Sequence, residues 1–342
     1  MDPVTQGALG AAATLSLLAQ RVPLSAAKLA AMGALGGMAA DLDVLIRSDS
    51  DPLLAIEFHR HFTHSLLFIP IGGALAALPW LVARSLRAQW RCVVLASSVG
   101  YATHALLDAC TTYGTLLFWP FSELRVSLSF ISVVDVLFTL PLLAAVIAAT
   151  VRGTGRWARW GLLWGTCVMG LGAMQQLRAE RLQREIARER GHALERSAVF
   201  PTISNNVAWR SLYRSGARYY VDKLRVPLLG DTCVTPGTSV PVVKNPLDDP
   251  RIAERMHPAS RRAERLLRWF SADWVAWDPE DPSVLGDLRY SFSPGEALPI
   301  WGVRSDATSG KVEWINNRSR RTPTFSDLVA LVTRDGPGAR CL

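Results

Sequence analysis

Cysteine is scarce in this 342-residue sequence, and several familiar signatures are missing with it. The chain has five cysteines and no Cys-x-x-Cys pair, which removes the usual signature of thiolate zinc sites and dithiol redox sites. It has no internal repeat, and its second half contains no recognisable catalytic motif. No basic residue precedes the first apolar run. A cleavable signal peptide normally has a positive leading region, so we expect a retained helix there.

The few cysteines divide between the two halves of the chain. Cys92, Cys110 and Cys167 lie within apolar runs, where a cysteine usually acts as a small buried hydrophobe. Cys233 and Cys341 lie in the more polar half, and they can pair if that half faces an oxidising compartment. We predict that these two residues lie close enough to form a disulfide.

Charged residues are also scarce in residues 1–176, which are dominated by Ala, Leu, Val, Gly and Trp. Residues 178–342 are Arg-rich and carry most of the acidic groups. The net charge of +8 would suit a nucleic-acid-binding protein. Much of that charge, however, lies in short loops beside apolar runs, where the positive-inside rule places basic residues. We therefore expect no nucleic-acid partner.

The apolar runs of the first half approach the roughly 20 residues that a membrane-spanning helix needs. They cover residues 4–19, 26–46, 62–83, 92–112, 126–151 and 157–176. We predict a mainly α fold, in which residues 1–176 form a polytopic membrane bundle of about six transmembrane helices. Residues 177–197 continue the last helix as an amphipathic stalk, and residues 198–342 form a smaller soluble α+β domain.

The soluble domain is predicted from short alternating and amphipathic segments. Residues 207–213 and 217–226 alternate around Ser215 and Gly216, which is typical of a hairpin. The other expected elements are helices over residues 251–274 and 326–333, and strands over residues 285–292 and 311–315.

Lys and Arg divide unevenly between alternate loops of the six-helix bundle. One set of loops contains Arg21, Lys28, Arg84, Arg87, Arg91, Arg152, Arg156 and Arg159, and the other contains Arg47, Arg60 and Arg125. The positive-inside rule places the richer set in the cytoplasm. We therefore predict that both termini, and the soluble domain, lie on the outer (periplasmic) side of a bacterial inner membrane.

Four of the six histidines lie in two short segments, His59-Arg60-His61-Phe62-Thr63-His64-Ser65 and His104-Ala105-Leu106-Leu107-Asp108. His104 and Asp108 are four residues apart, so on a helix both project from one face. An acidic pair, Asp41 and Asp43, ends another apolar run, and the predicted topology brings all three segments to the outer side. Imidazole and carboxylate are the usual ligands of zinc and related ions. We predict that one or two divalent ions, with zinc preferred, are bound by Asp41, Asp43, His59, His64, His104 and Asp108.

Other polar residues at the same depth are candidates for catalysis. Arg60 and Arg125 can neutralise phosphate oxygens, although Arg125 can equally cap a helix or meet lipid headgroups. Asp135 should lie about ten residues into the fifth helix, roughly 13 Å from its outer end, as a second ligand or as the group that orients water. Gln6 starts the first helix on the same side. The remaining histidines, His61, His192 and His257, are expected outside the site.

Together these motifs resemble the YdjM-type family of membrane-bound, metal-dependent hydrolases, which is linked by name to LexA-regulated expression. The resemblance is close over about residues 1–150 and loose beyond them. The stretches that carry it are Met1-Asp2-Pro3-Val4-Thr5-Gln6, Asp41-Leu42-Asp43, His59-Arg60-x-Phe62-Thr63-His64-Ser65, His104-x-Leu106-Leu107-Asp108, Thr111-Thr112-Tyr113-Gly114-Thr115, Pro120-Phe121-Ser122 with Arg125, and Asp135 with Thr139-Leu140-Pro141. The family usually has Gly in place of His61 and often Pro in place of Ala40, and neither change removes a candidate ligand. The resemblance implies a metal site and a hydrolase.

We therefore expect a membrane-embedded metal-dependent hydrolase that cleaves a phosphoester or lipid substrate, phospholipase-like, with metal-activated water. Membrane lipids are the expected partners, and the oligomeric state stays open. A transporter or ion-handling protein is the first alternative, but an ion path needs polar groups along its whole length, and the inner halves of the predicted helices have almost none. The second alternative is a membrane scaffold in which a metal serves as a structural clip.

Overall fold

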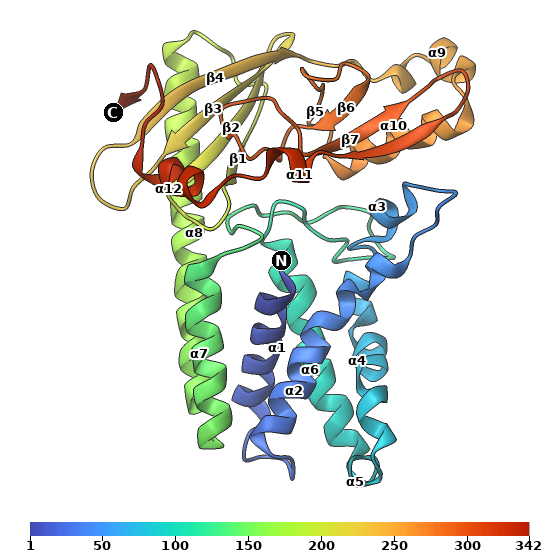
Figure 1. Ribbon diagram of the computed structural model, residues 1–342, viewed down its shortest axis with the longest axis vertical. Helices are drawn as coiled ribbons and strands as arrows, with labels where there is room; N and C mark the ends of the chain where they lie inside the picture. Colours follow the sequence, from blue (N-terminus) through green and yellow to red (C-terminus); the bar gives the residue numbers. More distant parts are fainter. Residues whose placement is uncertain (342) are drawn as a thin grey trace. The chain divides into compact units, whose positions relative to one another are not determined.

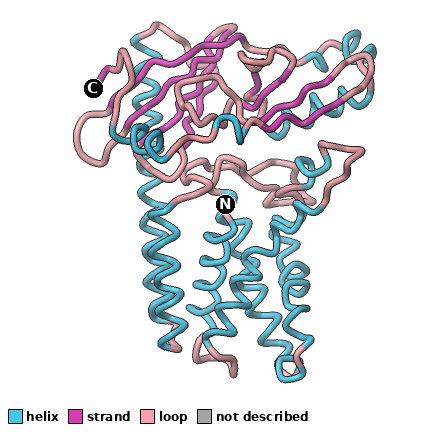
Figure 2. The backbone as a smooth tube through the Cα atoms, in the orientation of Figure 1, coloured by secondary structure: helices cyan, strands magenta, loops and turns pink. Residues whose placement is uncertain are grey.

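A computed structural model describes residues 1–341, and the chain divides into two compact units. Unit 1 contains Met1–Ile46 and Phe58–Ala173. Unit 2 contains the short segment Arg47–Glu57 and the chain from Met174 onward. Figure 1 gives the element labels, and Figure 2 shows that unit 1 is helical whereas the strands belong to unit 2.

Unit 1 is built from helices that stand side by side (Figure 1). The longer ones are α1 (Pro3–Leu18), α2 (Ala26–Ala39), α4 (Ile69–Ala77), α6 (Trp90–Ala109), α7 (Val136–Arg152) and the first part of α8 (Arg156–Glu189). The shorter ones, mostly 3-10 turns, are η1 (Ala40–Leu45), η2 (Phe62–His64), η3 (Leu66–Phe68), η4 (Leu78–Val82) and α5 (Arg84–Arg87). Helix α3 (Leu54–Phe58) lies mostly in the segment Arg47–Glu57 of unit 2.

Helices α1, α2 and α6 approach closely because glycines face their neighbours. A Cβ atom on Gly36 of α2 would lie 2.2 Å from the carbonyl oxygen of Ser97 in α6. A Cβ atom on Gly100 would lie 2.2 Å from the carbonyl oxygen of Gly33. Side chains larger than hydrogen would therefore push α2 away from α6, the helix that carries half of the site described below.

The prediction of a six-span membrane bundle is wrong. Among the described residues, α6 is the one helix that is long and apolar enough to cross a membrane by itself. The pair Leu54–His64 and Leu66–Val82 would add a second span at most, and it is bent by 66°. Helix α7 is apolar but shorter.

Apolar composition alone did not reveal where the expected helices break. The second run leaves the α-helical form after Ala39 and ends as η1. The third run is divided into 3-10 turns on both sides of α4. Residues 126–135, expected to begin the fifth helix, form an irregular loop, and α7 starts at Val136. The division of basic residues between loops assumed six spans, so its assignment of sides no longer follows.

Large apolar side chains nevertheless cover the outside of unit 1. Leu75 of α4 is 55% exposed, Leu140 of α7 is 59% exposed and Leu163 of α8 is 51% exposed. Water-soluble proteins rarely expose extended apolar surface of this kind. The surface is typical of helices that contact lipid.

Unit 2 contains two antiparallel sheets. The first has the strand order β1-β2-β3-β4-β9, and the second has the order β5-β6-β7-β8. The strands are β1 (Arg196–Pro201), β2 (Ala208–Ser215), β3 (Arg218–Arg225), β4 (Cys233–Pro241), β5 (Val275–Trp277), β6 (Val284–Asp287), β7 (Trp301–Ser305), β8 (Val312–Asn316) and β9 (Arg340–Cys341). Its further helices are η5 (Pro246–Asp248), α9 (Pro250–Arg255), α10 (Pro258–Phe270), α11 (Arg318–Arg321) and α12 (Phe325–Thr333).

The expected hairpin is present as β2 and β3, with Gly216 at φ 58° in the turn between them. The helix expected over residues 326–333 corresponds to α12. Strands β1, β4, β5 and β7 were not expected, because their segments are short or contain proline. The helix expected over residues 251–274 is divided into α9 and α10, since Pro258 cannot continue the ladder of α9.

Cys233 and Cys341 form a disulfide, with their Cα atoms 4.0 Å apart. This confirms the prediction that they lie close enough to bridge. The bond joins β4 to β9 and fastens the end of the chain to the first sheet.

Candidate metal centre

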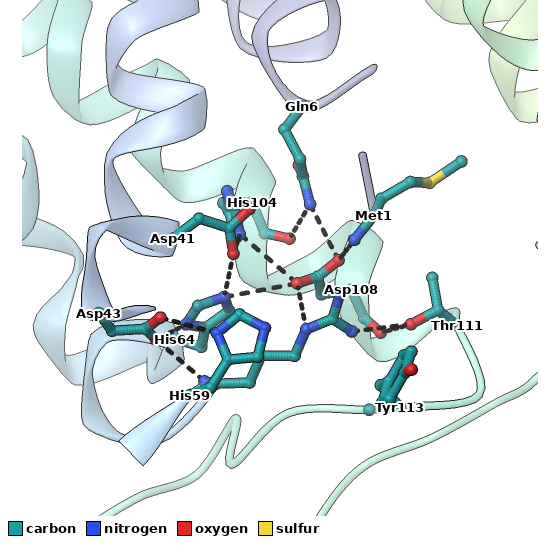
Figure 3. Close-up of polar contacts among 12 residues, drawn as sticks. Met1, Gln6, Asp41, Asp43, His59, His64, His104, Asp108, Thr111 and Tyr113 are labelled. Carbon is teal, nitrogen blue, oxygen red and sulfur yellow. Dashed lines mark hydrogen bonds and ion pairs between the residues drawn. The ribbon is translucent and has the colours of Figure 1, made fainter. Parts of the chain in front are cut away.

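Four side chains of unit 1 direct one ligand atom each toward a common point (Figure 3). The atoms are Oδ1 of Asp41, Nε2 of His64, Nε2 of His104 and Oδ2 of Asp108. Each histidine nitrogen lies 3.3–3.5 Å from both carboxylate oxygens. Three of the side chains are fully buried, whereas that of Asp41 is 21% exposed. We refer to these residues as the His/Asp quartet.

The spacing of the quartet fits a divalent ion. Zinc binds histidine nitrogen and carboxylate oxygen at about 2.0–2.2 Å, so the ligand atoms of a tetrahedral site stand roughly 3.3–3.6 Å apart. Among the described residues, none of the four atoms has a hydrogen-bond partner of acceptable geometry. Asp108 Oδ2 does lie 3.1 Å from Arg60 Nε in an ion pair. Buried polar atoms without hydrogen bonds are costly, and a shared cation would satisfy all four.

The hydrogen bonds on the far side of both imidazole rings favour metal binding. His104 Nδ1 lies 2.5 Å from the carbonyl oxygen of Gly37, which can only accept, so this nitrogen carries the proton. His64 Nδ1 lies 3.0 Å from the Thr63 hydroxyl and 3.3 Å from Asp43 Oδ2. Because Thr63 donates its own proton to Asp43, His64 Nδ1 is again the donor. When neutral, both rings therefore present Nε2 lone pairs to the centre, as metal-binding histidines do.

Asp43, predicted as a ligand, orients the ligands of the quartet instead. Its Oδ1 lies 2.8 Å from His59 Nδ1, and its Oδ2 accepts from the Arg60 amide at 2.9 Å and the Thr63 hydroxyl at 2.8 Å. Burial alone would raise the pKa of Asp43, but hydrogen bonds from His59 and His64 hold that pKa well below its ordinary value. The carboxylate therefore stays charged and fixes the loop that presents His64.

His59 lies at the solvent-facing edge of the site, with its side chain 32% exposed. Together with Asp41 and Asp43 it forms a second group whose ligand atoms lie close enough to hold an ion. An ion in this second group would share Asp41 with the quartet. The site residues can thus accommodate one or two ions, but His59 and Asp43 are already bonded to each other.

Asp108 is held by groups from two separate segments, the N-terminal residues at Oδ1 and Arg60 at Oδ2. Asp108 Oδ1 accepts from the amino group of Met1 and from the Gln6 amide, the latter at 3.0 Å. Arg60, which pairs with Oδ2, also donates to the Thr111 hydroxyl at 3.1 Å. Gln6 and Arg60 are therefore within the site, as expected, and both position Asp108.

The guanidinium of Arg125 is occupied by backbone carbonyls. Its Nη1 donates to Tyr113 at 3.3 Å and Gly114 at 3.2 Å, and its Nη2 donates to His59 at 3.3 Å. Arg125 thus ties the loop after α6 to the segment that begins with His59. This arrangement gives Arg125 a positioning role beside the site.

The expected depth of Asp135 is wrong, because α7 starts one residue after it and not ten residues before it. Asp135 is the N-cap of α7, and its Oδ1 accepts from the Phe138 amide at 3.0 Å. It belongs to neither of the metal-capable groups formed by the quartet and by His59 with its neighbours. The position of Asp135 therefore accounts for the start of α7.

Several groups that shape the site were not anticipated. The amino group of Met1 and the carbonyl of Gly37 contact Asp108 and His104, but backbone groups carry no compositional signal. Tyr101 donates to the Thr63 carbonyl at 2.7 Å and so supports the His64 loop. Thr63 lies within the histidine-rich stretch of residues 59–65, but its role follows only from the hydrogen bond that its hydroxyl donates to Asp43.

The charged groups of the site are mainly acidic. Three carboxylates, Asp41, Asp43 and Asp108, face the Arg60 guanidinium, and the Met1 amino group, whose pKa is lowered by burial, contacts Asp108 (Figure 3). A divalent ion would offset this negative charge.

Comparison with known proteins identifies a family that matches the first half of the chain. A family model described as YdjM inner membrane protein matches residues 1–179, which include the whole quartet. No curated protein and no solved structure was found to match the chain. Because the family match covers more than half of the sequence, the chain belongs to the YdjM inner membrane protein family.

Proposed function

We propose that this protein is a membrane-bound metal-dependent hydrolase whose metal centre is the His/Asp quartet. The observation that carries the proposal is the convergence of four ligand atoms within 4.8 Å of one another, with each histidine nitrogen 3.3–3.5 Å from both carboxylate oxygens and no hydrogen bond to any of them from the described residues. The two carboxylates repel each other, and an Nε2 atom without a proton cannot donate to them, so a cation between the four atoms would stabilise the set. Zinc is the preferred ion, because it binds this donor set in a tetrahedral arrangement.

A divalent ion supplies Lewis-acid chemistry that activates water for hydrolysis at neutral pH. The residues of the chain would provide the rest of the site. Arg60, fixed between Asp108 and Thr111, places a permanent positive charge where phosphate oxygens would bind. The Gln6 side-chain carbonyl oxygen is buried without a hydrogen-bond partner among the described residues, so it can accept a hydrogen bond from water or from a substrate hydroxyl.

The proposed substrate is a phosphoester or lipid ester at the membrane surface. Access would come from the side of Asp41 and His59, which are the partly exposed members of the site. Exposed apolar side chains follow Asp41 in the chain, with Leu42 60% exposed and Leu45 66% exposed. An apolar rim beside a charged centre suits a molecule that has both a headgroup and an acyl chain.

We place unit 2 on the oxidising, periplasmic side of the inner membrane. The disulfide between Cys233 and Cys341 supports this assignment, because stable disulfides are rare in the reducing cytosol. Labelling of thiols in intact cells before and after reduction would test it.

A structural metal clip is the second candidate, and the number of ligands favours it. Catalytic zinc sites commonly keep one position open, whereas four protein ligands are typical of structural sites. The two functions differ in which residues matter. A hydrolase needs Arg60 and Gln6 for turnover beyond their effect on metal content, whereas a clip does not.

The test is metal analysis followed by a hydrolysis screen on the purified full-length protein in detergent. We expect one or two zinc ions per chain, together with cleavage of a chromogenic phosphodiester or a phospholipid. Gln6→Ala should lower turnover by more than its effect on metal content explains. Bound metal without hydrolysis of either class would support the structural clip.

A further inference from the structure

The segment that joins two parts of the metal site is held by unit 2. Residues Arg47–Glu57 belong to unit 2 by their contacts, although the chain on either side of them belongs to unit 1. Asp43 precedes this segment by four residues, and His59 follows it by two. Whatever fixes residues 47–57 therefore limits where both side chains can lie, because so short a chain leaves little freedom.

An apolar anchor buries the middle of this segment. Leu53 is 2% exposed and belongs to a core cluster with Ala263 and Leu267 of α10 and with Val303 of β7. Ile56 packs against the same cluster. The segment therefore belongs to the hydrophobic core of unit 2 and does not lie on its surface as a loose connection.

An ionic anchor holds Asp51 and Glu57, the last residue of the segment, to a single arginine. Arg262 of α10 donates through Nη1 to Asp51 Oδ2 at 2.7 Å, and through Nη2 to Glu57 Oε2. Asp51 also accepts from the Leu53 amide at 3.1 Å, which links the ionic anchor to the apolar one. The planar guanidinium suits this double contact because its two amino groups point in fixed directions.

The anchored segment begins and ends next to the bonds that orient His64. Asp43 accepts from His59, from the Arg60 amide and from the Thr63 hydroxyl. The chain just before the segment and the chain just after it therefore meet at this carboxylate. Residues 47–57 lie inside the family match, but α10 lies outside it. Unit 2 thus holds a piece of the family region with residues that the family match does not include.

We infer that Arg262 and Leu53 are positioning residues, through which unit 2 sets the geometry and the metal affinity of the His/Asp quartet. The inference rests on the proposed function in one respect, because the measurement of zinc affinity assumes that the quartet binds zinc. Loosening the segment would free Asp43 and His59 to move, and the loop that presents His64 would then sample other positions. A ligand set that must be ordered before binding holds its ion more weakly.

The test combines amide hydrogen exchange with zinc affinity in the full-length protein in detergent. The variants are Arg262→Glu, which repels both acidic partners, and Arg265→Glu, a matched change at an exposed arginine of the same helix. A third variant combines Arg262→Glu with Asp51→Lys and Glu57→Lys, which restores the ion pairs with reversed signs. Zinc affinity is measured by competition with a chromogenic chelator.

We expect Arg262→Glu to speed exchange at least five-fold in residues 47–57 and also in residues 59–65, and to weaken zinc binding at least five-fold. Arg265→Glu should leave both within two-fold of the original protein, and the triple variant should recover most of the loss. Faster exchange confined to residues 47–57, with residues 59–65 unchanged, would overturn the inference. Amide hydrogen exchange reports on the link between residues 47–57 and residues 59–65 even in protein that binds no zinc. A failure of the proposed function is recognised separately, because the unaltered protein would then contain no zinc.

Discussion

The imidazole rings of His64 and His104 meet edge to face, with their centroids 4.6 Å apart and their planes inclined by 80°. Each ring is fixed from behind, His64 by Thr63 and Asp43 and His104 by the Gly37 carbonyl. The two Nε2 atoms consequently face the same carboxylates, Asp41 and Asp108. Packing between apolar groups would not require this orientation, whereas binding of a shared cation would.

Loss of either buried ligand from α6 should remove the metal. We expect His104→Ala and Asp108→Ala each to lower zinc affinity by more than ten-fold and to abolish hydrolysis, because a three-ligand remainder cannot replace the lost charge or donor. His61→Ala is the matched control, because His61 is not in the quartet and its ring centroid lies 5.7 Å from that of Trp119. Zinc content by elemental analysis measures the effect. Full zinc content in both ligand variants would contradict the assignment.

Asp43→Asn should weaken zinc binding without removing it. Partners that orient metal-binding histidines typically change affinity by about 10- to 100-fold when they are altered. Asn keeps the size of the side chain but loses the charge that the contacts with His59 and His64 favour. Chelator competition would show an intermediate affinity, between the original protein and His104→Ala. An effect as large as that of His104→Ala would instead make Asp43 a ligand.

The site residues show how much the sequence could predict and where prediction stopped. The spacing of His104 and Asp108 on a helix, and the position of Asp41 and His64 at the ends of apolar runs, indicated a shared site, and the structure brings ligand atoms of these four residues within 4.8 Å of one another. Their roles within the site depend on hydrogen bonds that no pattern records. The two oxygens of Asp43 are engaged by His59, Arg60 and Thr63, which separates it from Asp41 although the two are neighbours in the chain.

The fold was predicted less well than the site, because apolar composition does not fix helix length. Residues 126–135 are as apolar as a helix, yet they form a loop whose backbone bonds to the end of α6, as in the contact of the Leu128 amide with the Ala109 carbonyl. In unit 2 the hairpin at Gly216 was visible because glycine marks the turn. Strand β4 was not, because Pro236 and Gly237 are typical of loops.

Packing of α2 against α6 should be intolerant of added side-chain volume. We expect Gly36→Ala to destabilise unit 1 by roughly 1–3 kcal/mol, since its Cβ would meet the Ser97 carbonyl at 2.2 Å. Gly170→Ala on α8 is the control, because nothing lies within 4 Å of its added Cβ. Thermal unfolding in detergent compares the two variants. Equal stability for both would mean that the helices do not pack as described.

Removal of the disulfide should destabilise unit 2. The bond closes a loop with a sequence separation of 108, and such cross-links typically contribute about 2–4 kcal/mol by restricting the unfolded chain. Cys341→Ser should therefore lower the unfolding temperature of unit 2, and a reductant should reproduce the effect in the original protein. Cys167→Ser, at an exposed position, should change neither. A reductant without effect on the original protein would show that the bond is absent.

X-ray absorption at the zinc edge, measured on the purified protein, tests the central claim most directly. The account predicts a first shell of two imidazole nitrogens and two carboxylate oxygens at about 2.0–2.2 Å, with no sulfur. In His104→Ala one imidazole should be missing from the remaining signal, or the zinc should be lost altogether. A first shell containing sulfur, or an unaltered spectrum in His104→Ala, would place the metal elsewhere and contradict the assignment of the His/Asp quartet.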